Sequence, residues 1–402
     1  MKDCKLFCTK CGKEYKGSDA VYRCEVCNEP LEVESVKGAR ITEGNMLQQT
    51  ALQRYSEFYP FLDLNKDVSM GEGFTHLVEA KELADEAGVK NLYFKNESAN
   101  PTWSFKDRGT VTGIIHALDL GYDKIGTVST GNMAVSVAAY GSHCNLKTFV
   151  LVSKDLPPEK LNPVAIYGST LIKVEGDYGK MYYESINIGK EQNICFINSD
   201  APFRVVGYKT LAFELCEQLN FELPDYIVVP TSAGGHIRGI LKGFEEFKES
   251  GYIDRVPKMI CAQAAGCKPI DRAFQEGEEN IRRYENPHTI AHAIENPLPP
   301  SGNQVLRILK ENGGFTTSVE DEDVIKAQRR LGQTGLFVQP ASALTYAAVK
   351  NLKQEGKLKD SDKVVCVLTG SGLKYTAAFE KHDLTCYSSK LEDLGEFIKN
   401  EF

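Results

Sequence analysis

One lysine lies in a sequence context that could give it covalent chemistry. Lys106 follows Asn100 and Pro101, which end a preceding strand, and a helical pattern begins after it and continues to Leu118. A lysine at a helix start feels the positive end of the helix dipole, which favours the neutral amine. A neutral amine is the form that condenses to a Schiff base. The same run also fits an ordinary solvated helix start, so this lysine alone does not decide between the two interpretations.

Four cysteines near the N-terminus have the spacing of a metal site. Cys8 and Cys11 form one Cys-x2-Cys pair, and Cys24 and Cys27 form a second pair twelve residues further on. Two such pairs place four thiolates around a tetrahedral ion, the geometry that zinc prefers. We therefore expect residues 1–35 to form a zinc ribbon. A nucleic-acid-binding ribbon is the other class, but this one is only modestly basic and lacks an aromatic and arginine face.

Composition limits the class of protein. The chain has 402 residues, of which 42% are hydrophobic, enough for two domains or one large composite domain. A net charge of -8 argues against a nucleic-acid or anionic-membrane partner. No run approaches the ~18 apolar residues of a membrane span, and no signal sequence is apparent, so we expect a cytoplasmic protein. The twelve cysteines then fit metal ligands and buried small side chains better than disulfides.

Strands and helices alternate along most of the chain, which predicts mostly parallel sheets with helices on both faces. Apolar runs predict strands over 91–97, 124–129, 148–152, 165–167, 170–174, 195–198, 226–230, 258–264 and 363–368. Helical patterns are expected over 45–58, 80–87, 134–142 and 207–218, and a further helix is expected to open within 231–239 and run to about residue 249. The proline-containing stretch 271–312 is expected to be irregular.

Two turns between a strand and a helix could bind anions. The first covers residues 129–132 and the second covers residues 231–239. Backbone N–H groups at a helix start have no internal partners, and small residues such as Gly234 and Gly235 let the backbone approach a phosphate closely. The second turn matches neither the P-loop nor the full dinucleotide pattern, so nucleotide binding is a poor interpretation. An ordinary helix cap would also fit the first turn.

Five motifs resemble those of the threonine synthase family, within the fold-type II pyridoxal-phosphate (PLP) enzymes. They occur in the family's order at 100–109, 129–132, 231–235, 338–343 and 369–374, and so cover nearly the whole chain. The resemblance implies an α/β fold of two three-layer domains with mostly parallel sheets, plus the small N-terminal ribbon. The metal of the ribbon would then be structural.

We expect the chain to divide into three parts. The ribbon would occupy 1–35, a large PLP-binding domain 36–110 and 201–402, and a small mobile α/β domain 111–200. We also expect a homodimer by analogy with the family.

The resemblance assigns Lys106 as the catalytic residue that holds PLP. The predicted cofactor-binding residues besides it are Asn132, Ser232, Ala233, Gly234, Gly235, His236 and Thr369. Asn132 would bond the 3′-oxygen of the ring, and the Thr369 hydroxyl would face the pyridine nitrogen. Because a neutral hydroxyl cannot keep that nitrogen protonated as a carboxylate would, the cofactor suits β-elimination and replacement. We prefer this role for Thr369 to the alternative of a strand-end hydroxyl that caps the backbone.

The substrate is predicted to be a phosphorylated amino acid. Its carboxylate would bind the loop Ser129, Thr130, Gly131 and Asn132. The candidate donors to its phosphate are Ser104, Arg108 and His76, with Arg204 and Lys209 as further candidates.

The expected reaction converts O-phospho-L-homoserine and water to L-threonine and phosphate. Departures from the family pattern at Phe74, His76, Trp103, Glu295, Gln339 and Ser371 leave two enzymatic alternatives open. These are PLP-dependent β-replacement on O-phosphoserine, as in cysteate synthase-like relatives, and serine or threonine dehydration. A non-enzymatic zinc-ribbon scaffold would predict damage to the lysine or to the phosphate loop, and the sequence shows neither.

Overall fold

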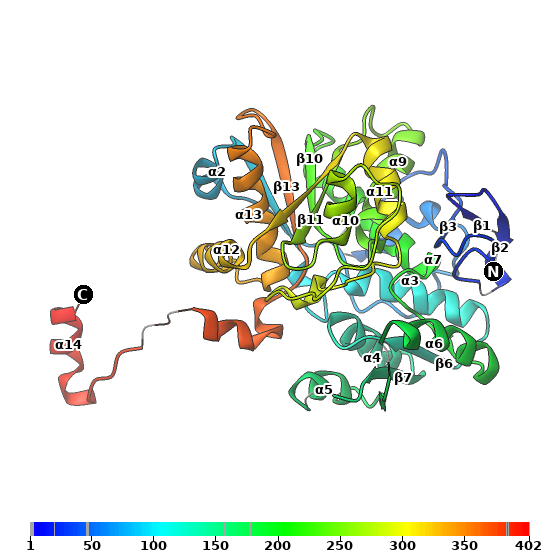
Figure 1. The fold of residues 1–402 in the computed structure, drawn as a ribbon, viewed down its shortest axis with the longest axis horizontal. Helices are drawn as coiled ribbons and strands as arrows, with labels where there is room; N and C mark the ends of the chain where they lie inside the picture. The colour runs from blue at the N-terminus through cyan, green and yellow to red at the C-terminus, as the bar shows by residue number, and fades with distance from the viewer. Residues whose placement is uncertain are drawn as a thin grey trace.

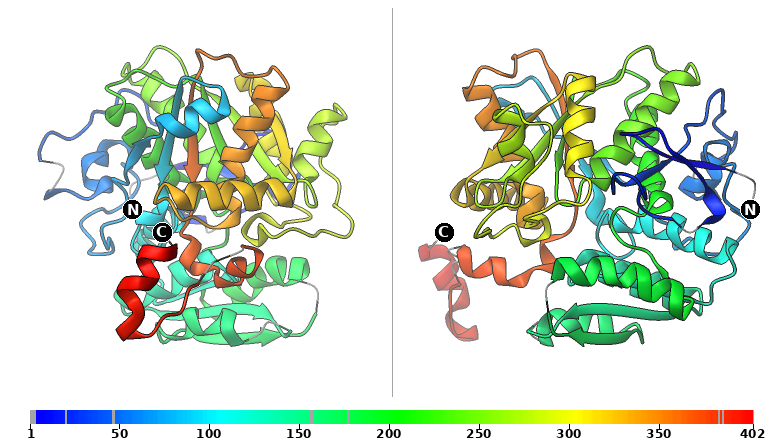
Figure 2. Two further views of the ribbon diagram at one scale, coloured as in Figure 1. Left: turned by 90° about the vertical axis from the view of Figure 1, so that its left-hand side faces the viewer. Right: turned by 45° about the vertical axis from the view of Figure 1, so that its right-hand side comes forward.

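Three β-sheets organise the chain in the computed structural model (Figure 1). The structure describes residues 4–19, 21–45, 48–155, 158–176, 178–382, 384 and 386–401. Within these residues the sheets have six, four and three strands. Figure 2 shows the four-stranded sheet below the six-stranded one, with the three-stranded sheet at the side.

The six-stranded sheet is parallel except at one edge. Its strand order is β12 (Phe315–Val319), β11 (Lys258–Ala264), β10 (Tyr226–Pro230), β13 (Lys363–Leu368), β5 (Asn91–Asn96) and β4 (Leu77–Glu79). Only β4 runs antiparallel to its neighbour. The central strands read as continuous apolar runs because parallel sheets are buried on both faces. The sequence therefore predicted them well.

Helices cover both faces of this sheet. In β10, Val228 packs into the cluster that contains Leu83 and Leu344, whereas Ile227 packs into the one that contains Leu211 and Ile240. Alternate strand residues point to opposite faces, so the two clusters are two separate layers of core. One face carries α2 (Lys81–Ala87), α12 (Asp321–Gln333) and α13 (Pro340–Gln354), and the other α8 (Lys209–Gln218), α9 (Gly235–Glu249), α10 (Pro269–Gln275) and α11 (Gly302–Asn312).

The four-stranded sheet is entirely parallel, in the order β8 (Thr170–Val174), β7 (Lys147–Ser153), β6 (Lys124–Val128) and β9 (Cys195–Phe196). Apolar residues of α4 (Asn132–His143) and α5 (Pro158–Ala165) pack on one face, and Met181 of α6 (Tyr178–Gln192) packs on the other. The helix α3 (Lys106–Asp119) joins the two sheets in the chain. The predicted parallel sheets are confirmed, and the division into domains stays a prediction.

The N-terminal sheet is small and antiparallel, in the order β2 (Glu14–Lys16), β1 (Lys5–Cys8) and β3 (Leu31–Val33). We call residues 4–35 the ribbon. The remaining short elements are η1 (Gly17–Asp19), α1 (Ala51–Arg54), η3 (Ser56–Phe58), η4 (Glu97–Ala99), α7 (Pro202–Val205), η5 (Val206–Tyr208), η6 (His292–Ile294), η7 (Gly372–Lys374), η8 (Thr376–Lys381), η9 (Leu391–Asp393) and α14 (Leu394–Glu401). Figure 1 shows α14 away from the rest of the chain. None of the helices described here is long and apolar enough to cross a membrane.

Three predicted elements are wrong. The run 165–167 is no strand, because Ala165 ends α5 and a turn follows. The stretch 271–312 is irregular only in its middle, since α10 and the amphipathic α11 form its ends. The helix expected over 45–58 shortens to α1 and η3, because Thr50 begins α1 with a capping box; residues 46 and 47 lie outside the described residues.

Candidate active site

Lys106 lies where two neighbouring strands of the large sheet end. It is the first residue of α3, which follows β5 through a short loop. Phe105 donates its backbone N–H to the carbonyl of Thr369 at 3.0 Å, and Ser371 donates to the carbonyl of Trp103 at 3.1 Å. These bonds hold the lysine loop against the segment that follows β13. The carboxyl ends of parallel strands are where open α/β sheets bind ligands.

The Lys106 amine is partly buried and lies 4.4 Å from the centre of the Phe105 ring. Burial and, secondly, the charge of Arg204 lower the pKa of Lys106 from 10.5 to about 7. Arg204 is held there because its Nη2 donates to the Lys106 carbonyl at 3.2 Å. A substantial share of the amine is therefore neutral near pH 7, the form that a nucleophile needs.

The loop before α9 forms a small cup of backbone. Gly234 has φ +95°, and a Cβ there would lie 2.9 Å from Ser301 Cβ and 2.8 Å from Val305 Cγ2. A Cβ at Gly235 would lie 2.7 Å from the carbonyl oxygen of Ser199. Positions 234 and 235 therefore require glycine. We call residues 232–236 the cup. The first amides of α9 have no partner within the helix, so the cup can receive an anion.

Several buried polar atoms beside Lys106 have no hydrogen-bond partner among the described residues. They are Ser104 Oγ, Arg204 Nε and both ring nitrogens of His236. The His236 ring stacks on the Phe105 ring with 3.8 Å between their centroids, so Phe105 contacts both His236 and the Lys106 amine. Burial, followed by the charges of Lys106 and Arg108, lowers the pKa of His236, which keeps the imidazole neutral. Unsatisfied buried groups cost about 1–3 kcal/mol each, so this cluster indicates a site for a polar ligand.

A chain of hydrogen bonds joins two predicted cofactor ligands. Asn132 Nδ2 donates to Gln339 Oε1 at 2.9 Å, and Gln339 Nε2 donates to Thr369 Oγ1 at 3.2 Å. Ser342 Oγ lies 2.9 Å from Thr369 Oγ1. The start of α4 is thereby tied to the end of β13. The sequence analysis included Ser342 in the motif 338–343 but gave it no role.

The predicted substrate loop surrounds the start of α4. Ser129 is buried, Thr130 and Asn132 are partly buried, and Gly131 is exposed. Gly131 N donates to Ser129 Oγ at 3.4 Å. The structure therefore brings this loop to the same edge as Thr369, through Asn132 and Gln339.

Arg108 does not join the other predicted substrate ligands. Its guanidinium is fully buried and contacts the carboxylates of Glu97 and Glu214, with bonds of 2.6 to 2.8 Å. Further bonds to Thr75 and Thr210 occupy its remaining N–H groups. The position of Arg108 fits a structural role and argues against a contact with substrate. The further candidate Lys209 is likewise occupied, by Glu246 and the carbonyl of Phe58.

Two other residues stand out beside the lysine loop. His76 is exposed, and its backbone carbonyl pairs with Asn96 at the end of β5. Trp103 has φ +63° and is 53% exposed. A positive φ is unusual for an aromatic residue, and such backbone conformations gather at functional sites. Trp103 therefore presents its ring to solvent next to Lys106.

The four ribbon cysteines converge. Their Sγ atoms all lie within 4.8 Å of one another, with 3.4 Å between Cys8 and Cys27 and 3.5 Å between Cys11 and Cys24. Tetrahedral zinc with bonds of about 2.3 Å would hold its sulfurs about 3.8 Å apart. The donor set therefore fits a zinc ion closely. Tyr15 donates its hydroxyl to Cys24 Sγ at 3.4 Å, a support for one ligand.

Comparison with known proteins gives the class. The family model described as "Pyridoxal-phosphate dependent enzyme" matches residues 68–370. This range includes Lys106, the cup and Thr369. The chain belongs to the family of pyridoxal-phosphate dependent enzymes.

Curated relatives are more specific. A threonine synthase of Methanocaldococcus jannaschii is 40% identical over 91% of this chain and 92% of that protein. A threonine synthase of Methanosarcina acetivorans is 34% identical over 92% of each chain. Both matches span nearly the full length.

Solved structures share the fold. The processed form of threonine deaminase isoform 2 from Solanum lycopersicum has a TM-score of 0.64 at 19% identity and covers 92% of each chain. Serine racemase from Dictyostelium discoideum has a TM-score of 0.62 at 26% identity, over 74% of this chain and 92% of that one. The predicted fold-type II architecture is confirmed.

Proposed function

We propose that this chain is a threonine synthase that converts O-phospho-L-homoserine and water to L-threonine and phosphate. The observation that carries the proposal is the full-length similarity to threonine synthases at 34–40% identity. The site supports it, because a lysine with a lowered pKa lies among unsatisfied polar atoms beside a glycine cup. The substrate assignment rests on the relatives, and the cofactor chemistry rests on the family and the site.

The residues present fit PLP. Lys106 would hold it covalently, residues 232–236 would receive its phosphate, Asn132 would bond its 3′-oxygen, and Thr369 would face its ring nitrogen. When bound, PLP supplies an electron sink for carbanions next to the amino group of the substrate. Gln339 donates to the Thr369 oxygen, so the Thr369 hydrogen can go either to Ser342 Oγ, 2.9 Å away, or to an acceptor on the ring.

Lys106 is proposed to move protons. With its amine free and neutral, Lys106 would take a proton from the substrate Cα and later return protons to neighbouring carbons. Its lowered pKa near 7 suits both directions at neutral pH. Phe105 below the amine excludes water from one side of it.

The substrate is proposed to be held at both ends. Residues 129–132 would bind its α-carboxylate at the start of α4. Ser104 Oγ, which is fully buried and unsatisfied, is our first candidate to donate to its phosphate. We do not propose Arg108 for this role, because two carboxylates already hold its guanidinium.

Other features are proposed by analogy. The four-cysteine cluster would hold one structural zinc ion, since its sulfur spacing fits that metal. We also propose a homodimer in the cytoplasm, and a small domain at 111–200 that moves relative to the large one.

The experiment compares three phosphorylated or hydroxylated amino acids. The PLP-loaded chain is given O-phosphohomoserine, O-phosphoserine or serine, and phosphate, threonine and keto acid are measured. The proposal predicts equal amounts of threonine and phosphate from O-phosphohomoserine alone. Phosphate release from O-phosphoserine that depends on an added nucleophile, with no threonine from O-phosphohomoserine, would instead favour β-replacement, and keto acid from serine would favour dehydration.

A further inference from the structure

A carboxylate of the ribbon reaches the helix that carries the phosphate cup. Glu32 on β3 accepts hydrogen bonds at one oxygen, Oε1, from Arg238 Nη2 at 3.1 Å and Arg238 Nε at 3.3 Å. The same oxygen accepts from Gln304 Nε2 at 2.6 Å. Arg238 lies on α9, one turn after the cup, and is only 2% exposed. A buried arginine needs such a carboxylate, because an unpaired buried charge is costly.

Arg238 also bonds Ser301, which contacts the backbone of the cup. Its Nη1 donates to Ser301 Oγ at 2.9 Å, and Ser301 N donates to the carbonyl of Ala233 at 3.0 Å. Ser301 is fully buried and, with Val305, is one of the two residues that a Cβ on Gly234 would strike. Ser301 therefore shapes the cup from outside, and Arg238 fixes where Ser301 lies.

On its other side Glu32 is close to the metal ligands. In the pairing of β1 with β3, Cys8 lies opposite Leu31, the residue before Glu32. Arg238 Nη2 also donates to the Leu31 carbonyl at 3.4 Å. Paired strand neighbours therefore connect a cysteine of the cluster to Leu31 and Glu32, and hydrogen bonds continue from there through Arg238 and Ser301 to the backbone of the cup.

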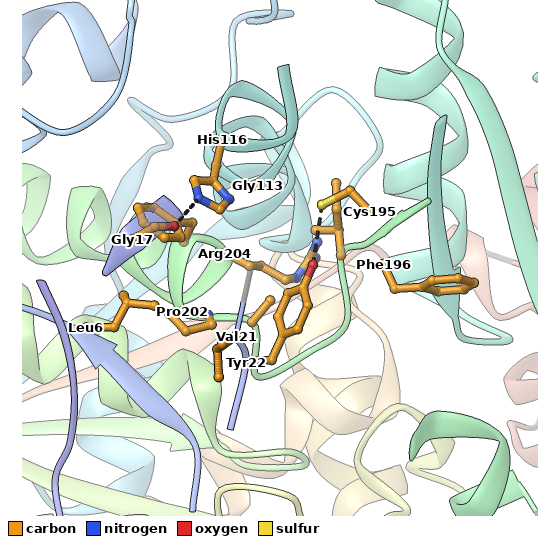
Figure 3. Close-up of a pocket in the computed structure, with 13 residues that line it drawn as sticks. Leu6, Gly17, Val21, Tyr22, Gly113, His116, Cys195, Phe196, Pro202 and Arg204 are labelled. Carbon is orange, nitrogen blue, oxygen red and sulfur yellow. Dashed lines mark hydrogen bonds between the residues drawn. The ribbon is translucent and has the colours of Figure 1, made fainter. Parts of the chain in front are cut away.

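Elsewhere the ribbon borders a cavity lined mostly by apolar side chains. Figure 3 shows the cavity between the ribbon, α3 and α7, where His116 bonds the Gly17 carbonyl and Tyr22 lies against Cys195. Its volume of about 10 Å³ is at the lower limit for one water molecule. It has no room for a ligand. The polar link through Glu32 is the stronger candidate for a functional contact.

We propose that Glu32 is a positioning residue for the cofactor phosphate, so that the metal-ordered ribbon sets the affinity of the chain for PLP. The inference rests on the proposed role of residues 232–236 as the phosphate cup. Without the carboxylate, Arg238 loses the partner that orients it and Ser301 loses its fixed donor. The wall of the cup can then move away from the phosphate.

The test measures the cofactor and not turnover. The apoprotein of each full-length variant is titrated with PLP by absorbance to give Kd, and the phosphorus NMR resonance of the bound phosphate is recorded. Glu32→Ala is expected to raise the Kd by about tenfold and to shift the resonance, because hydrogen bonds to charged groups are typically worth such a factor. Glu32→Gln keeps the accepting oxygen and should recover part of the affinity.

Two further variants separate this path from general loosening of the ribbon. Ser301→Ala breaks the path at its next step, so it should resemble Glu32→Ala, and the double variant should be little worse than either single one. Glu29→Ala removes a comparable contact of the ribbon with Asn303 and Arg307 on α11. Because Glu29 bonds neither Arg238 nor Ser301, the phosphate resonance should stay at its wild-type position.

The outcomes are distinct. Glu32→Ala with the wild-type Kd and resonance would overturn the inference while the proposed function stands. The same would follow if Glu29→Ala shifted the resonance as much as Glu32→Ala does. A wild-type chain that binds no PLP would overturn the proposed function and this inference together.

Discussion

At the scale of single residues, Lys106 shows how burial prepares a nucleophile. Sequence reasoning attributed its neutral form to the helix dipole. In the structure, the larger causes are burial and the nearby charge of Arg204, which together lower the pKa to about 7. Both causes depend on residues brought together by the fold, because Arg204 lies 98 positions away along the chain.

The first prediction concerns pH. Because the pKa of Lys106 is lowered to about 7 in the folded state, its amine is mostly protonated below pH 7 and mostly neutral above it. The rate at which the apoprotein captures PLP should therefore rise about tenfold per pH unit below pH 7 and level off above it. Stopped-flow absorbance would measure this rate. A rate that keeps rising to pH 10 would contradict the lowered pKa.

The same shift predicts a change in stability. Between pH 7 and 10.5 the unfolded chain binds the Lys106 proton more than the folded chain does, so this residue makes the free energy of unfolding rise with pH in that window. The variant Lys106→Met should lose that contribution. Urea unfolding of both apoproteins at pH 7 and pH 9 would measure the difference.

A second residue prediction concerns Gln339, which bonds both Asn132 and Thr369. Gln339→Ala removes two hydrogen bonds, each worth about 0.5–1.5 kcal/mol, so PLP affinity should fall by about threefold or more. Gln339→Glu keeps an oxygen that accepts from Asn132 and should retain more affinity. Titration of the apoproteins with PLP checks the order. Equal affinity for Gln339→Ala and the wild type would show that the bridge does not position the cofactor ligands.

At the scale of elements, the start of α3 is fixed by buried charges. Arg108 on α3 binds Glu97 of η4 and Glu214 of α8, and Lys95 of β5 binds Glu214 as well. All four side chains are buried. Losing one partner leaves a buried charge uncompensated, which is strongly destabilising. This network holds the lysine helix against the sheet and against α8.

At this scale we predict that breaking the buried charge network destabilises the apoprotein. Arg108→Ala should lower the free energy of unfolding of the apoprotein by about 3–5 kcal/mol in urea. Arg282→Ala serves as the control, because its pairs with Glu276 and Glu278 are exposed and should matter by less than about 1 kcal/mol. An Arg108 variant with wild-type stability and a raised KM for the substrate would restore the rejected substrate role.

Elements also show where sequence reasoning succeeds. The strands β10, β11 and β13 were predictable because buried parallel strands are unbroken apolar runs. The apolar run 165–167 failed because a short run looks alike in a strand and at a helix end. The glycine cup could be predicted from Gly234 and Gly235. The partners of Arg108 could not, since Glu214 is 106 positions away and no local pattern records that contact.

At the scale of the whole molecule, the ribbon is part of the enzyme body. Besides the path through Glu32, Arg23 bonds Asp200 at 2.5 Å and Arg307 of α11 bonds Glu29 at 2.9 Å. Sequence spacing predicted the four-cysteine cluster, but not what the ribbon touches. Those contacts join residues more than 170 positions apart.

The whole-molecule prediction concerns the metal. The purified wild type should contain about one zinc per chain. Cys11→Ser removes one of the four ligands, so this variant should contain much less zinc and show a lower midpoint of thermal unfolding. Cys386→Ser is the matched control, since Cys386 is also exposed but lies outside the cluster. Metal content by mass spectrometry and a thermal scan would decide. Unchanged zinc in Cys11→Ser would contradict the predicted site.

The most direct test of the central claim follows the cofactor and the products together. The purified chain is scanned for the visible absorbance of lysine-bound PLP, then given O-phosphohomoserine while threonine and phosphate are assayed. We expect a yellow protein that releases both products in equal amounts, and a Lys106→Ala variant that lacks both the absorbance and the turnover. A yellow wild-type protein that forms no threonine, or a Lys106→Ala variant that still turns over, would contradict the account.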